Sequence, residues 1–117
     1  MNPKKFVISK EQIKPLKCGL GGCLATDRIT VEGRGVNFMY RQKPDRPDDS
    51  GWRFFSGFEE DQTYLENPDH LAIYDVNTIV NYEPDILSIV ESAIGSVFER
   101  DPVSRKWKSV TDFEIPE

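Results

Sequence analysis

The sequence predicts an α+β fold: a single domain of 117 residues with an antiparallel sheet of about five strands and one main helix, about 84–94, packed on it. Two observations predict this class. Short segments rich in apolar and aromatic residues are joined mostly by tight turns, and only one stretch has the spacing of an amphipathic helix. A parallel sheet would need a helix after each strand, which this chain cannot supply. An antiparallel sheet covered on one face follows.

The first half of the chain predicts a hairpin. We expect a short strand and a turn over 4–16, and a tight glycine-rich turn at 18–23 before a buried strand. In 36–41, Val, Phe and Tyr alternate with Asn, Met and Arg, the period-two pattern of a strand with one buried face. The loop 43–50 holds two prolines and three aspartates, so the chain should turn back there into a return strand at 52–56.

The second half of the chain predicts a third strand and then the helix. The strand is expected at 71–76. Pro84 suits the first position of the helix, apolar residues recur at i, i+3, i+4 and i+7 from Ile86, and Gly95 suits its end. Two closing strands are expected at 96–100 and 107–111, and frayed termini at 1–5 and 112–117.

Charge is distributed unevenly along the chain. Residues 1–43 hold nine Lys and Arg against three Asp and Glu, whereas residues 44–102 hold three against fourteen. An acidic face repels phosphates, so nucleic acid is not the expected partner. Apolar runs are far too short to span a membrane, and the region after the first lysines lacks the apolar core of a signal peptide. We expect a cytoplasmic protein without a membrane partner.

Catalytic and metal-binding motifs are weak. The glycines at 19–22 are not followed by the lysine of a phosphate-binding loop. Cys18, Cys23 and His70 could supply at most three of the four ligands of a structural zinc site. The carboxylates at 59–61 do not match a calcium loop, and no nucleophile signature is present. We expect no cofactor, no metal and no enzymatic activity.

A candidate surface lies where aromatic and acidic residues concentrate. Nine of the thirteen aromatic residues fall within 38–82, a region that also holds nine of the twenty acidic ones. In the strand that begins at Trp52, Phe54 shares the face of Trp52, whereas Arg53 and Phe55 point the opposite way. A sheet covered on one face should therefore leave aromatic surface exposed. Aromatic residues and arginine rimmed by acids are typical of protein interfaces.

Several motifs in this region carry a resemblance to a known family. They are Phe-Met-Tyr-Arg at 38–41, Asp-Ser-Gly-Trp-Arg-Phe-Phe-Ser-Gly at 49–57, Ile-Tyr-Asp-Val-Asn-Thr at 73–78, Asn-Tyr at 81–82, Pro-Asp-Ile at 84–86 and Gly-Ser-Val-Phe-Glu-Arg at 95–100. In order and spacing the stretch of about 23–101 resembles immunity protein family 33, although Phe58 stands where an acidic residue is expected. The resemblance implies a bacterial cytosolic protein that binds and neutralises the toxin domain of a polymorphic toxin system.

We therefore expect a non-enzymatic domain that binds a basic protein partner through an acidic, aromatic surface. Arg41, Trp52 and Arg53 are the expected anchors, and the carboxylates would speed association. The alternative is a housekeeping domain that binds a small ligand or peptide beside the Trp52 strand, and a third reading is an acid–base enzyme using Glu59 or Asp61. The expected binding residues are Arg41, Asp49, Trp52, Arg53, Glu59, Glu60, Asp61, Asp75 and Asn77.

Overall fold

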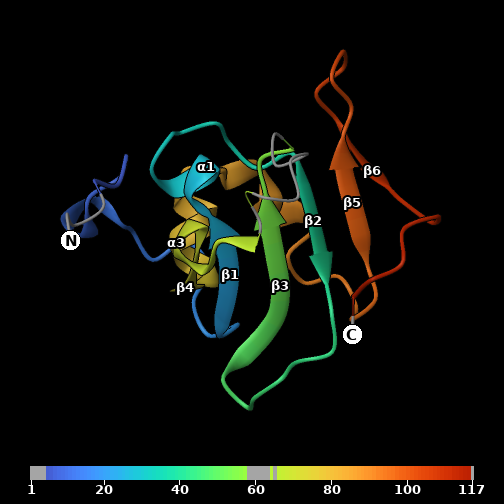
Figure 1. Cartoon of the computed structure of the whole chain (residues 1–117), viewed down its shortest axis with the longest axis horizontal. Coiled ribbons are helices and arrows are strands. Elements are labelled where there is room, and N and C mark those ends of the chain that lie inside the picture. Colours follow the sequence, from blue (N-terminus) through green and yellow to red (C-terminus); the bar gives the residue numbers. More distant parts are fainter. Residues whose placement is uncertain (1–4, 58–63, 65, 117) are drawn as a thin grey trace.

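A mixed sheet of six strands forms the frame of the molecule (Figure 1). The computed structural model describes residues 5–57, 64 and 66–116. The strands lie side by side in the order β4-β1-β3-β2-β5-β6, and every neighbouring pair is antiparallel except β1 and β3. Their bounds are β1 Gly22–Thr26, β2 Phe38–Arg41, β3 Asp49–Phe55, β4 Leu71–Asp75, β5 Val97–Arg100 and β6 Trp107–Ser109.

The predicted α+β class is confirmed, and so is the hairpin of β2 and β3, which pairs Phe38 with Phe55 and Arg41 with Trp52. The sheet differs from the prediction in one pairing, that of β1 with β3, which is parallel. After β1 the chain crosses to β2 on the far side of β3, and β3 then returns between β1 and β2. No strand forms within the described residues 5–21, where 4–16 was expected to contribute one. A 3₁₀ turn at Lys10–Gln12 stands there instead.

The main helix lies earlier than the sequence predicts. It is α3, Val76–Tyr82, and the stretch predicted as a helix opens with a 3₁₀ turn at Pro84–Ser88 and continues as turns. Asp75 ends β4 and starts α3 because its side chain accepts a hydrogen bond from the Asn77 N–H at 2.9 Å. The β-branched residues of α3 favour strands, so the sequence pattern did not predict a helix there. The apolar spacing from Ile86 marks residues that are buried, but they do not form a continuous helix. A short helix, α1 Asp27–Thr30, follows β1.

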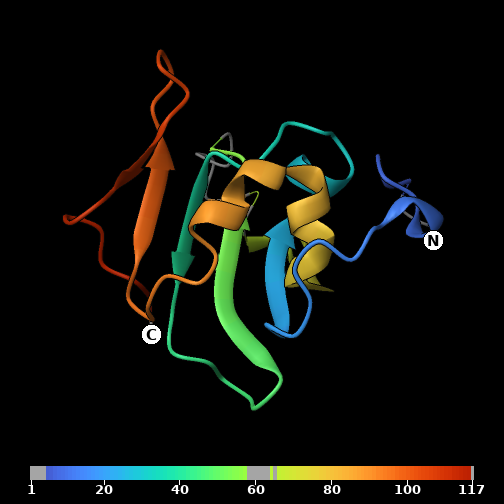
Figure 2. The same cartoon turned by 180° about the vertical axis from the view of Figure 1, so that it is seen from behind.

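The core lies between the sheet and the helical segments. α3 and the connection 84–92 lie behind the sheet in Figure 1 and in front of it in Figure 2. Trp52 and Phe54 are fully buried on this covered face and stack with their ring centroids 5.9 Å apart. The Trp52 indole N–H also donates to the Val90 carbonyl at 2.7 Å. The fully buried apolar residues of the core are Ala25, Ile29, Val36, Met39, Trp52, Phe54, Val76, Ile79, Val80, Ile86 and Val90.

The glycine-rich segment before β1 joins three parts of the chain. Gly21 has φ of +102°, and a Cβ there would lie 2.6 Å from the Asp48 carbonyl oxygen, so only glycine fits. The Gly22 N–H donates to the same carbonyl at 2.7 Å, and the Val76 N–H donates to the Gly21 carbonyl at 3.0 Å. The segment therefore brings the loop before β3 and the start of α3 to the same end of the sheet.

Candidate binding surface

The predicted binding residues lie in three separate places. Glu59, Glu60 and Asp61 fall outside the described residues. Among the others, Arg41 and Trp52 lie on the covered face of the sheet, and Arg53 lies on the opposite face, which we call the open face. Asp49 pairs with Arg53, whereas Asp75 and Asn77 lie where β4 meets α3.

Arg41 and Trp52 support the fold from within. Trp52 has no exposed surface, so a partner cannot reach it in this conformation. The Arg41 guanidinium donates from Nε to the Ser50 carbonyl and from Nη1 to the Ser92 carbonyl, each at 2.8 Å. It also lies 5.8 Å from the centroid of the Trp52 ring. Arg41 thereby ties β2 and β3 to the connection that covers them.

Arg53 forms a bidentate ion pair with Asp49, the first residue of β3. Its Nη2 lies 2.8 Å from Oδ2 of Asp49 and its Nη1 3.0 Å from Oδ1, and the two side chains are only 6% and 8% exposed. Asp49 also accepts the N–H groups of Asp45 and Gly51. The hydrogen bonds from Arg53 hold the pKa of the Asp49 carboxyl far below its usual range. The arginine charge is therefore neutralised inside the protein, and the pair clamps the loop before β3.

Asn77 also serves the fold. Its side-chain oxygen accepts the N–H groups of Leu16 and Lys17, each at 2.8 Å, and its amide donates to the Lys14 carbonyl at 2.8 Å. Asn81, one turn later, accepts the Lys14 N–H at 2.9 Å. The two asparagines hold the basic N-terminal segment against α3 through its backbone, and the Lys17 ammonium pairs with Glu91 at 2.7 Å.

Exposed carboxylates gather at one end of the open face, and we call Asp45, Asp48 and Asp75 the acidic end. Gly22 connects the backbones of two of them, because it pairs with Asp75 across the β1–β4 ladder and its N–H bonds to the Asp48 carbonyl. The Asp45 carboxylate lies 3.6 Å from Arg53. All three are exposed. Beside them is a hollow of about 190 Å³, lined by Gly22, Cys23, Leu24, Asp45, Arg46, Asp48, Asp49, Arg53 and Ile73.

Apolar and aromatic side chains continue from the acidic end along the open face. Ile73, opposite Leu24 in the ladder, is 61% exposed. Further along the sheet, the rings of Tyr40 and Phe55 stack at 5.7 Å between centroids. Phe113 reaches this cluster from the C-terminal segment and lies 5.4 Å from Tyr40. The open face thus offers carboxylates at one end and partly exposed apolar surface beside them.

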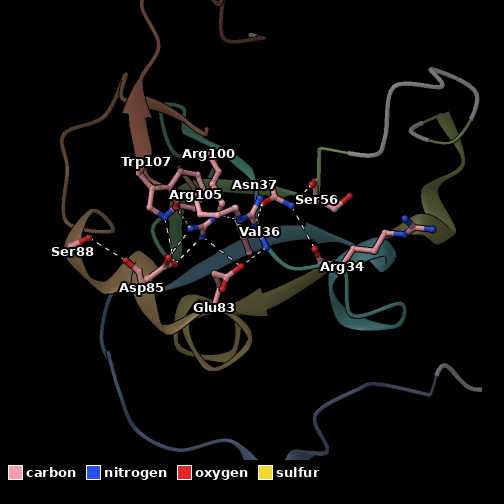
Figure 3. A network of polar contacts seen from close by, with 10 residues as sticks. All are labelled: Arg34, Val36, Asn37, Ser56, Glu83, Asp85, Ser88, Arg100, Arg105 and Trp107. Carbon is pink, nitrogen blue, oxygen red and sulfur yellow. Dashed lines mark hydrogen bonds and ion pairs between the residues drawn. The ribbon is translucent and has the colours of Figure 1, made fainter. Parts of the chain in front are cut away.

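A second ion pair, between a buried arginine and a half-exposed carboxylate, was missed by the sequence reasoning (Figure 3). Arg100, whose side chain is 4% exposed, donates to both carboxylate oxygens of Asp85 at 2.7 and 2.9 Å. These hydrogen bonds lower the pKa of Asp85. The guanidinium lies 4.3 Å over the ring of Trp107, and Glu83 approaches it at 3.5 Å while accepting the Val36 N–H. Both residues belong to sequence motifs shared with the family, at 84–86 and 95–100. They are fifteen residues apart and lie in different elements, so the sequence gives no sign that they pair.

The two cysteines and the single histidine lie in different surroundings. Cys18 is exposed and Cys23 buried, and burial, with the nearby Asp75 charge, raises the pKa of the Cys23 thiol. The imidazole of His70 stacks on Tyr64 with centroids 3.9 Å apart. Within residues 5–57, 64 and 66–116, no three His, Cys, Asp or Glu side chains gather as metal ligands. In the same part of the chain, no helix is long and apolar enough to cross a membrane.

The fold and this surface define a small α+β protein that keeps the Arg53–Asp49 pair inside and leaves one sheet face open. The family model described as Immunity protein Imm33 domain matches residues 23–111. The chain belongs to this family, as the resemblance predicted. Comparisons with curated proteins and with solved structures found no match. Membership suggests a toxin–immunity role with a protein partner such as a toxin, and the family is generally non-enzymatic.

Proposed function

We propose that this protein binds a toxin domain and neutralises it without catalysis, and that the acidic end of the open face makes the contact. The observation that carries the proposal is the meeting of Asp48 and Asp75 across Gly22, with the exposed Ile73 beside them. Carboxylates flanking an apolar side chain suit a basic protein surface. Glu59, Glu60 and Asp61 remain part of this proposal on the sequence alone.

Buried and exposed carboxylates have different roles in this proposal. Asp49 is bound by Arg53 inside the protein, so its charge contributes little field outside it. Asp45, with 72% of its side chain exposed, and its neighbours Asp48 and Asp75 project their field into solvent. That field steers a basic partner over about a Debye length, ~8 Å at physiological salt. Apolar contact at Ile73 then slows dissociation.

The test begins by identifying the partner. The tagged chain is used to capture proteins from its native cell, and a toxin domain encoded beside its gene is cloned as the candidate partner. Co-expression of chain and toxin should restore growth, and the purified pair should bind without any change in the toxin's covalent structure. A toxin that is modified, or growth that is not restored by a chain that binds it, contradicts the proposal.

A matched pair of variants tests the surface. Asp45→Lys, Asp48→Lys and Asp75→Asn together change the charge of the acidic end while keeping a helix-capping side chain at 75. Glu11→Lys, Glu91→Lys and Glu114→Gln make the same charge change at exposed positions elsewhere. We expect the first set to slow association by at least about tenfold at low salt, and the second by much less. Equal effects of the two sets would place the contact elsewhere.

The alternative function, binding of a small ligand or peptide, has one observation in its favour. A hollow of about 450 Å³ lies beside Arg41, within the usual size range of ligand sites. It is lined by Arg41, Gln42, Lys43, Pro44, Asp45, Ile94, Gly95, Ile115 and Pro116. A metabolite that raises the melting temperature of the chain, with the effect removed by Ile94→Asp, would support this function over toxin binding.

A further inference from the structure

The two edges of the sheet are built differently. β6, at one edge, has three residues, carries Lys108 and follows Lys106. Short length and lysine are features that protect an edge strand from pairing with another chain. β4, at the other edge, is Leu-Ala-Ile-Tyr-Asp over Leu71–Asp75, with no lysine or proline. Its central residue, Ile73, is exposed. The β4 edge lacks the protection that the β6 edge has.

The ladder between β1 and β4 shows which backbone groups face outward. The Val76 N–H donates to the Gly21 carbonyl at the end of this ladder. Hydrogen-bonded pairs alternate along an antiparallel ladder, so Tyr74 and Ala72 bond to β1 while Ile73 points its N–H and carbonyl away from the sheet. The Asp75 N–H and the Leu71 carbonyl point the same way. Among the described residues, none bonds to these four groups.

Charge around the edge indicates what could pair with it. Asp75 ends β4, Asp48 lies next to it across Gly22, and Asp69 precedes the strand, all of them exposed. Leu71, Ile73 and Asp75 share the open face, because side chains alternate along a strand. A strand added to this edge would place one side chain beside Ile73 and another, two residues along, beside Asp75. An apolar residue suits the first position and lysine or arginine the second.

We propose that the β4 edge receives an extended, basic segment of a protein partner as a seventh strand of the sheet. This inference deepens the proposed function by stating how the toxin domain is held. Main-chain hydrogen bonds to Ile73, Asp75 and Leu71 supply affinity, and the alternation of apolar and basic side chains supplies selectivity. The adjacent acidic end attracts the segment and fixes its direction.

The test uses a defined probe and so does not depend on the toxin. The probe is a fluorescent ten-residue peptide in which lysine and valine alternate on one strand face with threonine between them, and the control peptide has glutamate for lysine. Fluorescence anisotropy with the full chain should show binding of the lysine peptide only. On binding, amide hydrogen exchange should slow at Ile73 and Asp75 in the unmodified chain, since their N–H groups become bonded.

Two proline variants separate the edges. Ile73→Pro removes the outward N–H of β4, and Ser109→Pro removes the outward N–H of β6, where Val110 bonds inward to Val97. We expect at least about a tenfold loss of peptide affinity for the first and little change for the second. Ile73→Ala, which keeps the N–H, should lose less than Ile73→Pro. If Ile73→Pro does not fold, the exchange measurement on the unmodified chain decides.

The outcomes distinguish this inference from the function on which it rests. Unchanged exchange at Ile73 and Asp75 with the peptide bound, or full affinity in a folded Ile73→Pro variant, overturns the added strand. A dimer of the chain alone that Ile73→Pro dissociates also overturns it, because a second copy would then occupy the edge. Peptide binding at the edge in a chain that gives no protection against the toxin leaves the inference standing and rejects the proposed function.

Discussion

The two faces of the sheet use the same strands for different purposes. On β3, Trp52 and Phe54 point into the core on the side of the connection 84–92, while Arg53 and Phe55 point to the open face. The covered face contains no exposed aromatic group on β3, whereas Phe55 is partly exposed and Ile73 is largely so. One stretch of sequence thus supplies both the support of the fold and its candidate contact surface. A distinctive sequence motif can therefore support the fold without touching a partner.

The largest expected effect is on the covered face. Trp52→Ala should lower the free energy of unfolding by about 3–5 kcal/mol, because it leaves a cavity and breaks the hydrogen bond to Val90. Phe55→Ala on the open face should cost about 1 kcal/mol, since that ring is partly solvated already. Trp107→Ala should also cost less than Trp52→Ala. Urea titrations of the three variants check this, and equal losses would mean that the two faces do not differ as described.

The next largest loss of stability is expected when the Arg53–Asp49 ion pair is broken. Asp49→Asn should cost about 2–3 kcal/mol, because it leaves the buried Arg53 without its carboxylate. Asp45→Asn should change stability by less than about 0.5 kcal/mol, because that carboxylate is mostly exposed and lies 3.6 Å from Arg53. Thermal or urea denaturation compares them. A large loss for Asp45→Asn would show that Asp45, not Asp49, is the main partner of Arg53.

Acid should weaken both ion pairs. The pKa values of Asp49 and Asp85 are lowered by Arg53 and Arg100, so both carboxyls bind protons more weakly in the folded chain than in the unfolded one. Their contribution is complete above the unfolded pKa of about 4 and is lost as pH falls through the lower folded values. The free energy of unfolding should therefore fall below about pH 4. Urea titrations at pH 7, 4 and 3 measure this fall, which should be shallower in Asp49→Asn.

The smallest effect is expected where the C-terminal segment touches the open face. Phe113→Ala should cost about 1 kcal/mol or less, because the ring is 37% exposed and packs on the rings of Phe38 and Tyr40 at the surface. The matched substitution in the core, Phe54→Ala, should cost several times more. A loss at Phe113 as large as that at Phe54 would show that the C-terminal segment covers the open face as firmly as α3 covers the other.

The predictable part of the fold came from local patterns. Alternation in 36–41 and 52–56 is a short-range signal, and the hairpin it predicted is confirmed. The helix was misplaced because Val76–Tyr82 carries β-branched residues that favour a strand, and only the Asp75 cap and packing against the sheet make it helical. The apolar spacing after Pro84 correctly marked Ile86 and Val90 as buried, although most of that stretch forms turns.

Composition and local motifs are enough to predict the α+β class, the family and the acidic character of the middle of the chain. Which carboxylates pair with arginine, and which stay exposed to solvent, depends on the tertiary structure. Asp49 pairs with Arg53 in the interior and the half-exposed Asp85 pairs with the buried Arg100, whereas Asp48 and Asp75 lie at the surface on either side of Gly22. Nothing in a linear sequence distinguishes these carboxylates, since burial and pairing depend on which distant segments the sheet brings together.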